Sequence, residues 1–334
     1  GTFTDISKSS GIGALPAKGL GVAIWDYDHD GRPDIFVAND GMPGFLLHNL
    51  GGCKFEDLGI RSGLAYDDSG NYHSGMGIDA GDIDGSGGTS VVVTNFSEQQ
   101  TSLYRETSTG IFRDVRISSG VGPPSQDTLG FATFFLDYAN EGFPGIFVLN
   151  GHVQDDIAGL QPGVTYAEPP FLFHNQRDGT FVNVAPISGG PLAGKIVGRS
   201  AAWGDFDNDG KLDILVTTSG GKAELWHNVT PNTGHWIGLR LIGTKSNRDG
   251  IGAVVTARAG NRTSTIAVRS GSSYLSSSDL RAHLGLGGAT SAEVTVTWPS
   301  GIVDHIASIP AGSYYNLVEG EGKVSPCLAR VKPA

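Results

Sequence analysis

Two short stretches of this chain alternate aspartates at a spacing that suits a hard cation. Each reads Asp-x-Asp-x-Asp-Gly-x-x-Asp, and the candidate ligands are Asp26, Asp28, Asp30, Arg32 and Asp34 in the first and Asp205, Asp207, Asp209, Lys211 and Asp213 in the second. Calcium takes about 6–8 oxygen ligands, which four carboxylates, a backbone carbonyl and water can supply. Without a cation, four carboxylates this close would repel one another. Each stretch therefore predicts a Ca²⁺ site.

These stretches differ from EF-hand loops. An EF-hand places a bidentate glutamate at position twelve, between two helices. Position twelve is Val37 in the first stretch and Val216 in the second, each inside an apolar run. We therefore expect a shorter loop that closes a β-hairpin, with Asp34 and Asp213 as the last ligands. A solvated acidic turn is the alternative, which the recurrence of the pattern disfavours.

Two further stretches share this outline but have fewer acidic ligands. In place of the full pattern, the second in chain order offers Asp82, Asp84, Ser86 and Ser90, and the third offers Asp137, Ala139, Glu141 and Gly145. Fewer charged ligands lower the affinity for calcium. We expect weak or no cation binding at the second stretch and none at the third.

All four stretches belong to one repeat. The repeated segments span residues 19–40, 74–96, 130–151 and 199–219, and each has an apolar run on both sides of its loop. A third apolar run follows in every copy, at 45–49, 102–106, 171–175 and 224–228, and a fourth follows in three, at 54–58, 111–115 and 181–184. Four short strands per repeat, joined by glycine turns, predict an all-β fold with the blades of a β-propeller. His48, His174 and His227 recur at one place in the third run, and we interpret them as structural.

The beginning of the chain resembles the fourth run of a repeat. Gly1–Ser7 reads GTFTDIS, which matches KFEDL at 54–58. We therefore expect residues 1–231 to form four propeller blades plus an orphan outer strand at Thr2–Ile6. Strands from the region beyond residue 232 would close the ring, or further blades would come from another chain or an upstream segment, because an unpaired edge strand is prone to aggregate.

The rest of the chain predicts a second, smaller β-domain. Residues 232–320 contain seven short strand-like runs separated by Gly, Asn and Ser turns, which favours a small sandwich, and 321–334 is predicted as a tail. The net charge of −11 without any basic run argues against nucleic acid as a partner. No apolar run approaches the roughly 20 residues that span a membrane. Cys53 and Cys327 form either a long-range disulfide or two free thiols.

The repeats resemble the FG-GAP/VCBS family, whose blade type also occurs in integrin α-chain propellers. Residues 232–320 resemble the ASPIC/UnbV domain of the cartilage acidic protein family, and the motifs that carry this likeness are GTKSNRDGIGA (Gly243–Ala253), VRSGSSYLSSSDLRAHLGLG (Val268–Gly287) and VTVTWPSG (Val294–Gly301). The resemblance implies a secreted or cell-envelope protein, calcium in the repeat loops, and interaction rather than catalysis.

The preferred interpretation is a non-enzymatic binding or adhesion module for protein or glycan on a cell surface or in a matrix, with calcium ordering its loops. A polysaccharide-active enzyme on a propeller scaffold and a structural subunit of an extracellular assembly are the alternatives. The sequence lacks the GxSxG, HExxH and phosphate-loop motifs. A carboxylate pair assembled from distant blades would still serve a glycosidase, so the first alternative stays open.

Overall fold

A computed structural model describes residues 2–327 of the chain and confirms the all-β class. Strands of three to eight residues dominate, and the α-helices are single turns of four residues: α1 (Ser7–Ser10), α2 (Gly59–Ser62), α3 (Ile157–Leu160) and α4 (Ala185–Ser188). Three 3₁₀ turns accompany them: η1 (Ile12–Ala14), η2 (Pro123–Ser125) and η3 (Gly190–Ala193). No helix among residues 2–327 is long and apolar enough to cross a membrane.

Each repeat folds into its own antiparallel sheet, with the strands side by side in chain order. The first sheet contains β1 (Gly19–Trp25), β2 (Asp34–Asn39), β3 (Phe45–Gly51) and β4 (Lys54–Asp57). The second contains β5 (Gly75–Gly81), β6 (Ser90–Asn95), β7 (Ser102–Ser108) and β8 (Ile111–Asp114). The third contains β9 (Gly130–Leu136), β10 (Gly145–Asn150), β11 (Phe171–Asn175) and β12 (Phe181–Asn183). The fourth has three strands: β13 (Gly198–Gly204), β14 (Asp213–Thr218) and β15 (Glu224–Trp226).

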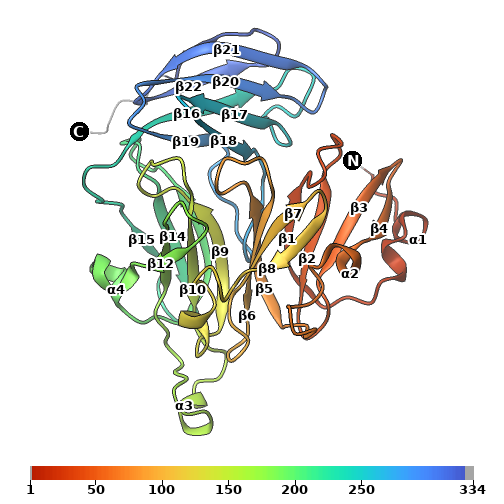
Figure 1. Ribbon diagram of the computed structural model, residues 1–334, viewed down its shortest axis with the longest axis vertical. Helices are drawn as coiled ribbons and strands as arrows, with labels where there is room; N and C mark the ends of the chain where they lie inside the picture. Colours follow the sequence, from red (N-terminus) through yellow and green to blue (C-terminus); the bar gives the residue numbers. More distant parts are fainter. Residues whose placement is uncertain (1, 328–334) are drawn as a thin grey trace.

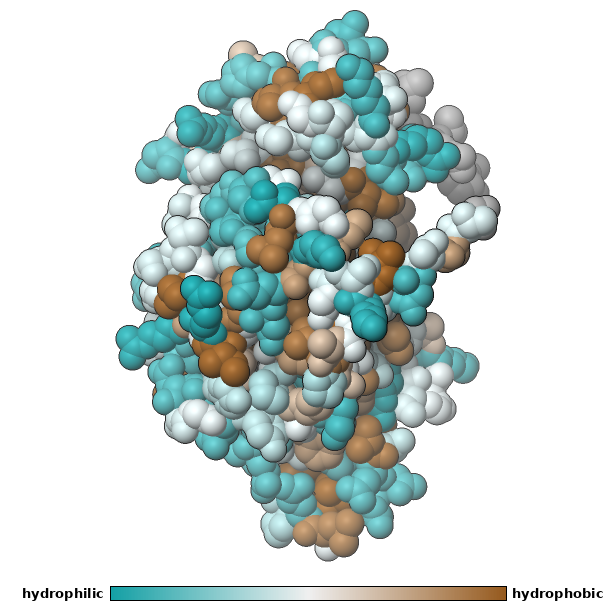
Figure 2. All heavy atoms as spheres, turned by 90° about the vertical axis from the view of Figure 1, so that its right-hand side faces the viewer, coloured by the Kyte–Doolittle hydropathy of each residue, from teal (hydrophilic) through white to brown (hydrophobic). Residues whose placement is uncertain are grey.

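The four sheets pack in series through their first strands, β1 against β5, β5 against β9 and β9 against β13 (Figure 1). Buried apolar side chains fill the interfaces, such as Phe36 with Val91 and Phe147 with Val216. The arrangement is consistent with propeller blades, but the sheets formed by residues 2–327 do not close a ring. Viewed from the side of the first sheet, the surface carries apolar side chains in small patches among polar ones (Figure 2).

The predicted orphan strand is not a strand. Thr2–Ile6 has no regular structure, is exposed, and leads into α1. A side chain at Gly11, just after that helix, would meet the Phe55 carbonyl of β4 at 2.7 Å, as one at Gly63 would meet Phe112 of β8 at 2.4 Å. The opening segment thus docks on the following sheet as the other repeat connections do. Within residues 2–327 this segment pairs with no strand beyond residue 232, as one of the two alternatives would require, because it forms no strand itself.

Two four-stranded sheets follow, here called the C-terminal sheets. One has the order β19 (Ala282–Gly287), β16 (His235–Ile242), β22 (Ser313–Val318) and β23 (Val324–Pro326); the other has β18 (Arg262–Ala267), β17 (Val254–Ala259), β20 (Ser291–Thr297) and β21 (Val303–Pro310). Both contribute to one core around Trp298, Ile237 and Val255. Strand β23 lies within the segment predicted as a tail, where it pairs with β22.

A loop between β18 and β19, here called the axial loop (Val268–Arg281), descends from the C-terminal sheets into the centre of the repeat sheets (Figure 1). Ser273 donates its N–H to the Ile78 carbonyl of β5 at 3.1 Å, and its Oγ accepts the Thr133 N–H of β9 at 2.8 Å. Asp279 donates its N–H to the Trp203 carbonyl of β13 at 3.0 Å. The C-terminal region therefore joins three repeat sheets through a loop, whereas the first of the two alternatives considered was that its strands close a ring.

Candidate cation sites

The first acidic loop connects β1 to β2, and hydrogen bonds from its own backbone shape it. Asp26 accepts the N–H groups of Asp30 at 3.1 Å and Gly31 at 2.9 Å. Asp34 is fully buried at the start of β2 and accepts the N–H groups of Tyr27 and Asn49. Carboxylate oxygens of Asp26, Asp28 and Asp34 lie within 4.8 Å of one another. Three of the side chains predicted to share a cation are therefore brought together.

The fourth loop repeats this geometry between β13 and β14. Asp205 accepts the N–H groups of Asp209 at 3.1 Å and Gly210 at 2.9 Å, and buried Asp213 accepts those of Phe206 and Asn228. Carboxylate oxygens of Asp205, Asp207 and Asp213 again lie within 4.8 Å of one another. The recurrence shows that the nine-residue pattern, rather than its surroundings, sets the shape of the loop.

One atom in the first loop lacks a partner that a cation would provide. Asp28 Oδ1 is buried and makes no hydrogen bond within residues 2–327, although a carboxylate oxygen removed from water normally has one. Burial raises the pKa of Asp34 to about 6 and also raises that of Asp26, with nearby aspartates adding to both effects. A bound divalent cation would satisfy the orphan oxygen and oppose this charge repulsion. The donor set, all carboxylate oxygens, fits calcium.

Two of the recurring histidines, His48 and His227, lie against the first and fourth loops. Our interpretation of the histidines as structural did not predict these contacts. His48 Nδ1 is 3.2 Å from Asp34 Oδ1, and His227 Nδ1 is 2.9 Å from Asp213 Oδ1. Each histidine also groups with the second and third aspartates of its loop. Their recurrence in the third strand was the signal, because that strand lies beside the one that begins with the last aspartate.

The side chains of Arg32 and Lys211, named for their position in the pattern, pair with the third aspartate of each loop. Arg32 Nη2 contacts Asp30, and Lys211 Nζ is 3.2 Å from Asp209 Oδ2. Asp30 and Asp209 also cap the N–H groups of Arg32 and Lys211 at 2.8 Å. These two aspartates therefore have a partner of opposite charge even without a metal.

In the second loop, an arginine side chain takes the place that histidine has elsewhere. Arg105 stands in β7 where His48 stands in β3, and its Nη2 pairs with Asp84. The Asp82 carboxylate accepts the N–H groups of Gly85 and Gly87, and Ser86 Oγ accepts the Gly88 N–H. Buried Ser90 begins β6, at the place of Asp34. The sequence comparison of loop residues alone missed Arg105, because it lies fifteen residues beyond the loop on the chain.

The third loop keeps its shape with two acidic residues, Asp137 and Glu141, at the four pattern positions. Asp137 accepts the N–H groups of Glu141 and Gly142, and burial raises its pKa to about 6. Arg177 pairs with Glu141 at 2.8 Å. A side chain at Gly145 would meet the Phe173 carbonyl at 2.4 Å, so the last aspartate of the pattern has no room here.

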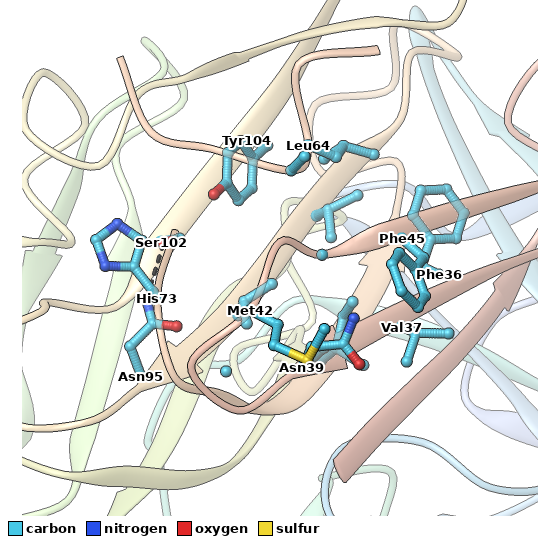
Figure 3. Close-up of a pocket in the computed structure, with 17 residues that line it drawn as sticks. Phe36, Val37, Asn39, Met42, Phe45, Leu64, His73, Asn95, Ser102 and Tyr104 are labelled. Atoms are coloured by element: carbon cyan, nitrogen blue, oxygen red, sulfur yellow. Dashed lines mark hydrogen bonds between the residues drawn. The ribbon is translucent and has the colours of Figure 1, made fainter. Parts of the chain in front are cut away.

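The disulfide considered for Cys53 and Cys327 is not formed, because both thiols are free. Cys53 is exposed in the turn between β3 and β4, whereas Cys327 follows β23 in the C-terminal sheets. The apolar hollow between the first two sheets, lined by Phe36, Leu64 and Tyr104, has a volume of 40 Å³ (Figure 3). Such a volume suits roughly one or two water molecules rather than a ligand.

Comparisons with known proteins agree with these features. Residues 149–216, which include the fourth loop, match the FG-GAP-like repeat model, and residues 243–324 match the ASPIC and UnbV model. The chain is 28% identical to human cartilage acidic protein 1 over 89% of its own length and 43% of the relative, and 27% identical to the mouse protein over 89% and 44%. The Xenopus tropicalis protein is 28% identical over 64% of this chain and 33% of the relative.

The chain therefore spans less than half the length of the cartilage acidic protein 1 relatives. A solved structure of an Agrocybe aegerita lectin that recognises terminal N-acetylglucosamine aligns at 17% identity over 65% of this chain and 68% of the other. Its TM-score of 0.30 is too low to support a shared fold or ligand.

Proposed function

We propose that this chain is a non-enzymatic, extracellular binding module in which calcium orders the first and fourth repeat loops. The observation that carries the proposal is the pair of matched triads, whose carboxylate oxygens lie within 4.8 Å in each loop. The buried, unpartnered Asp28 Oδ1 adds a ligand atom that the protein itself leaves unsatisfied. Calcium would supply positive charge there, and the aspartates would hold the loop around it.

Calcium fits these loops better than magnesium does. Magnesium demands near-ideal octahedral geometry and keeps several waters, whereas calcium accepts several carboxylates in flexible arrangements. Calcium sites of extracellular modules have dissociation constants of roughly 0.1–1 mM, which suits loops that are partly open to solvent. The match to FG-GAP-like repeats and the likeness to cartilage acidic protein 1 support an extracellular setting.

In this proposal the four repeat sheets are propeller blades that present loops to a partner, and the two C-terminal sheets form a small second domain. The partner is a protein or a glycan of a cell surface or matrix. A glycan array and a pull-down from native matrix, each with calcium and with chelator, would identify the class. Binding that is equal in both conditions would contradict a role for calcium in recognition.

Metal analysis of the full chain tests the calcium proposal. We expect two calcium ions per chain, and a lower melting temperature in chelator, because a ligand that binds only the folded state adds about 2.7 kcal/mol at 100-fold over Kd. Asp207→Ala should leave one ion and Asp28→Ala the other. An unchanged melting temperature in chelator, together with no detectable metal, would refute the proposal.

A further inference from the structure

The fourth loop, unlike the first, lies directly under the C-terminal sheets. Tyr314 of β22 donates its hydroxyl hydrogen to Asp205 Oδ2 at 2.9 Å. Arg281, at the end of the axial loop, donates from Nη2 to the Asp205 carbonyl at 2.8 Å and from Nη1 to Asn208 Oδ1 at 2.5 Å. The first aspartate of this loop therefore has contacts on both its side chain and its backbone from the other domain.

Aromatic packing seals the same contact. Trp236 lies against the loop glycine, where a β-carbon on Gly210 would be 1.8 Å from Trp236 Nε1. Trp236 also packs on Tyr314, with ring centroids 4.8 Å apart, and the Arg281 guanidinium lies 4.0 Å above the Tyr314 ring. Packing among Trp236, Tyr314 and Arg281 therefore fixes the position of the Tyr314 hydroxyl that donates to Asp205.

The third loop extends this contact. Asn140 donates from Nδ2 to the Gly210 carbonyl at 2.7 Å, and its Oδ1 lies 2.8 Å from His283 Nε2 of β19. Its carbonyl accepts the Gly287 N–H at 2.9 Å, and the Ala139 carbonyl accepts the Gly234 N–H at 2.8 Å. The third loop, which has fewer acidic residues than the first and fourth, therefore connects the fourth loop to the C-terminal sheets.

The first loop provides an internal control for these contacts. Among residues 2–327, Asp26 accepts hydrogen bonds only from its own loop, and nothing lies within 4 Å of a β-carbon built on Gly31. The first loop meets the second loop through His29, whose Nε2 lies 3.0 Å from the Gly87 carbonyl oxygen. Two loops of one sequence pattern therefore sit in different surroundings.

We propose that Tyr314 and Arg281 are positioning residues of the fourth cation site, so that calcium binding there and docking of the ASPIC/UnbV domain are linked. This inference rests on the proposed calcium function. The donors from the second domain fix the orientation of Asp205 before the ion binds, as outer partners of metal ligands do. Linkage is reciprocal: if docking strengthens calcium binding by some factor, calcium strengthens docking by the same factor.

Calorimetric titration of the full chain with CaCl₂ tests the proposal. In an Asp28→Ala background, which removes the first site, Tyr314→Phe should weaken the remaining calcium site about 10-fold, as loss of an outer partner commonly does. Phenylalanine keeps the aromatic ring under Arg281, so the fold is retained. In an Asp207→Ala background, which leaves only the first site, Tyr314→Phe should not change the calcium Kd.

Two substitutions of matched glycines give a second measurement. Gly31 and Gly210 have φ of 83° and 87°, so alanine strains both loops alike, but only Gly210→Ala meets Trp236. By hydrogen exchange in the Asp28→Ala background, calcium should protect the Gly234 and Gly287 amides, and Gly210→Ala should abolish that protection while Gly31→Ala does not.

The outcomes separate the two proposals. Calcium that binds both loops of the unmodified chain, with a Kd at the fourth site that Tyr314→Phe leaves unchanged and with no calcium effect on exchange at Gly234 and Gly287, would overturn the linkage alone. Failure of the unmodified chain to bind calcium would overturn both the linkage and the proposed function.

Discussion

At the scale of single residues, burial changes the chemistry of Glu168 more than its neighbours do. This glutamate precedes β11 and is 1% exposed. Its Oε2 accepts the Leu129 N–H at 2.9 Å, whereas its Oε1 is buried and has no hydrogen-bond partner in the described part of the chain. Loss of solvation raises the pKa of Glu168 to about 8, although that hydrogen bond and the positive charges of Arg199 and Lys195 act in the opposite direction. The carboxyl group is thus protonated over most of the neutral range.

The raised pKa of Glu168 predicts a pH-dependent stability. A carboxyl whose pKa is higher in the folded state than in the unfolded state stabilises the fold below the unfolded value, 4.5, and this contribution is lost as pH rises through about 8. Each pKa unit corresponds to about 1.4 kcal/mol. We therefore expect Glu168→Gln to flatten the decline in unfolding free energy between pH 5 and pH 8, measured by urea denaturation in chelator.

The exposed Glu98 offers the matched control, because it lies at the surface near the same end of the sheets. Glu98→Gln should leave the pH dependence of unfolding unchanged. If Glu168→Gln and the unmodified chain lose the same unfolding free energy from pH 5 to pH 8, the raised pKa of Glu168 is refuted.

At the scale of elements, the axial loop joins the two halves of the molecule through an ion pair whose carboxylate is buried. Arg269 pairs with Asp79 of β5 and donates to the Ala80 carbonyl at 3.0 Å. Asp79 is 2% exposed and also accepts the N–H groups of Phe135 and Ala80. Burial raises the pKa of Asp79, and Arg269 offsets that effect.

Breaking this pair should destabilise the protein strongly. Arg269→Ala leaves a buried carboxylate without its cation, which commonly costs about 3–5 kcal/mol. We expect a clear fall in unfolding free energy by urea denaturation. Asp79→Asn combined with Arg269→Met should recover part of the loss, because no isolated charge stays buried. Equal stability of Arg269→Ala and the unmodified chain would show that the axial loop does not depend on this contact.

At the scale of the whole molecule, the row of sheets ends in two apolar faces. Alternate residues Leu20, Val22 and Ile24 on β1 are 42%, 47% and 47% exposed. On the fourth sheet, the cross-strand partners Leu215 and Leu225 are 47% and 52% exposed. Contiguous exposed apolar patches commonly mark interaction surfaces. The faces share the apolar character of the contacts between neighbouring sheets inside the row.

We therefore expect the 334-residue chain to associate with itself through these end faces at rising concentration. Val22→Lys with Ile24→Lys should lower the average mass in sedimentation, because two charges would lose solvation in the contact. Ile60→Lys, an exposed apolar residue on α2, is the control and should have no effect. A chain that stays monomeric at all concentrations would contradict this prediction.

The sequence by itself determined the loops and the strands that flank them. Within the first loop, the hydrogen bonds to Asp26 and the one from Tyr27 to Asp34 span at most seven residues. Apolar runs on both sides of the loop mark the flanking strands. For these features, local spacing was sufficient. Tertiary structure alone decided which loops face another domain. Tyr314 and Asp205 are 109 residues apart, Arg269 and Asp79 are 190 apart, and Arg105 reaches Asp84 from a neighbouring strand. Such contacts depend on how sheets pack, which residue spacing along the chain does not encode.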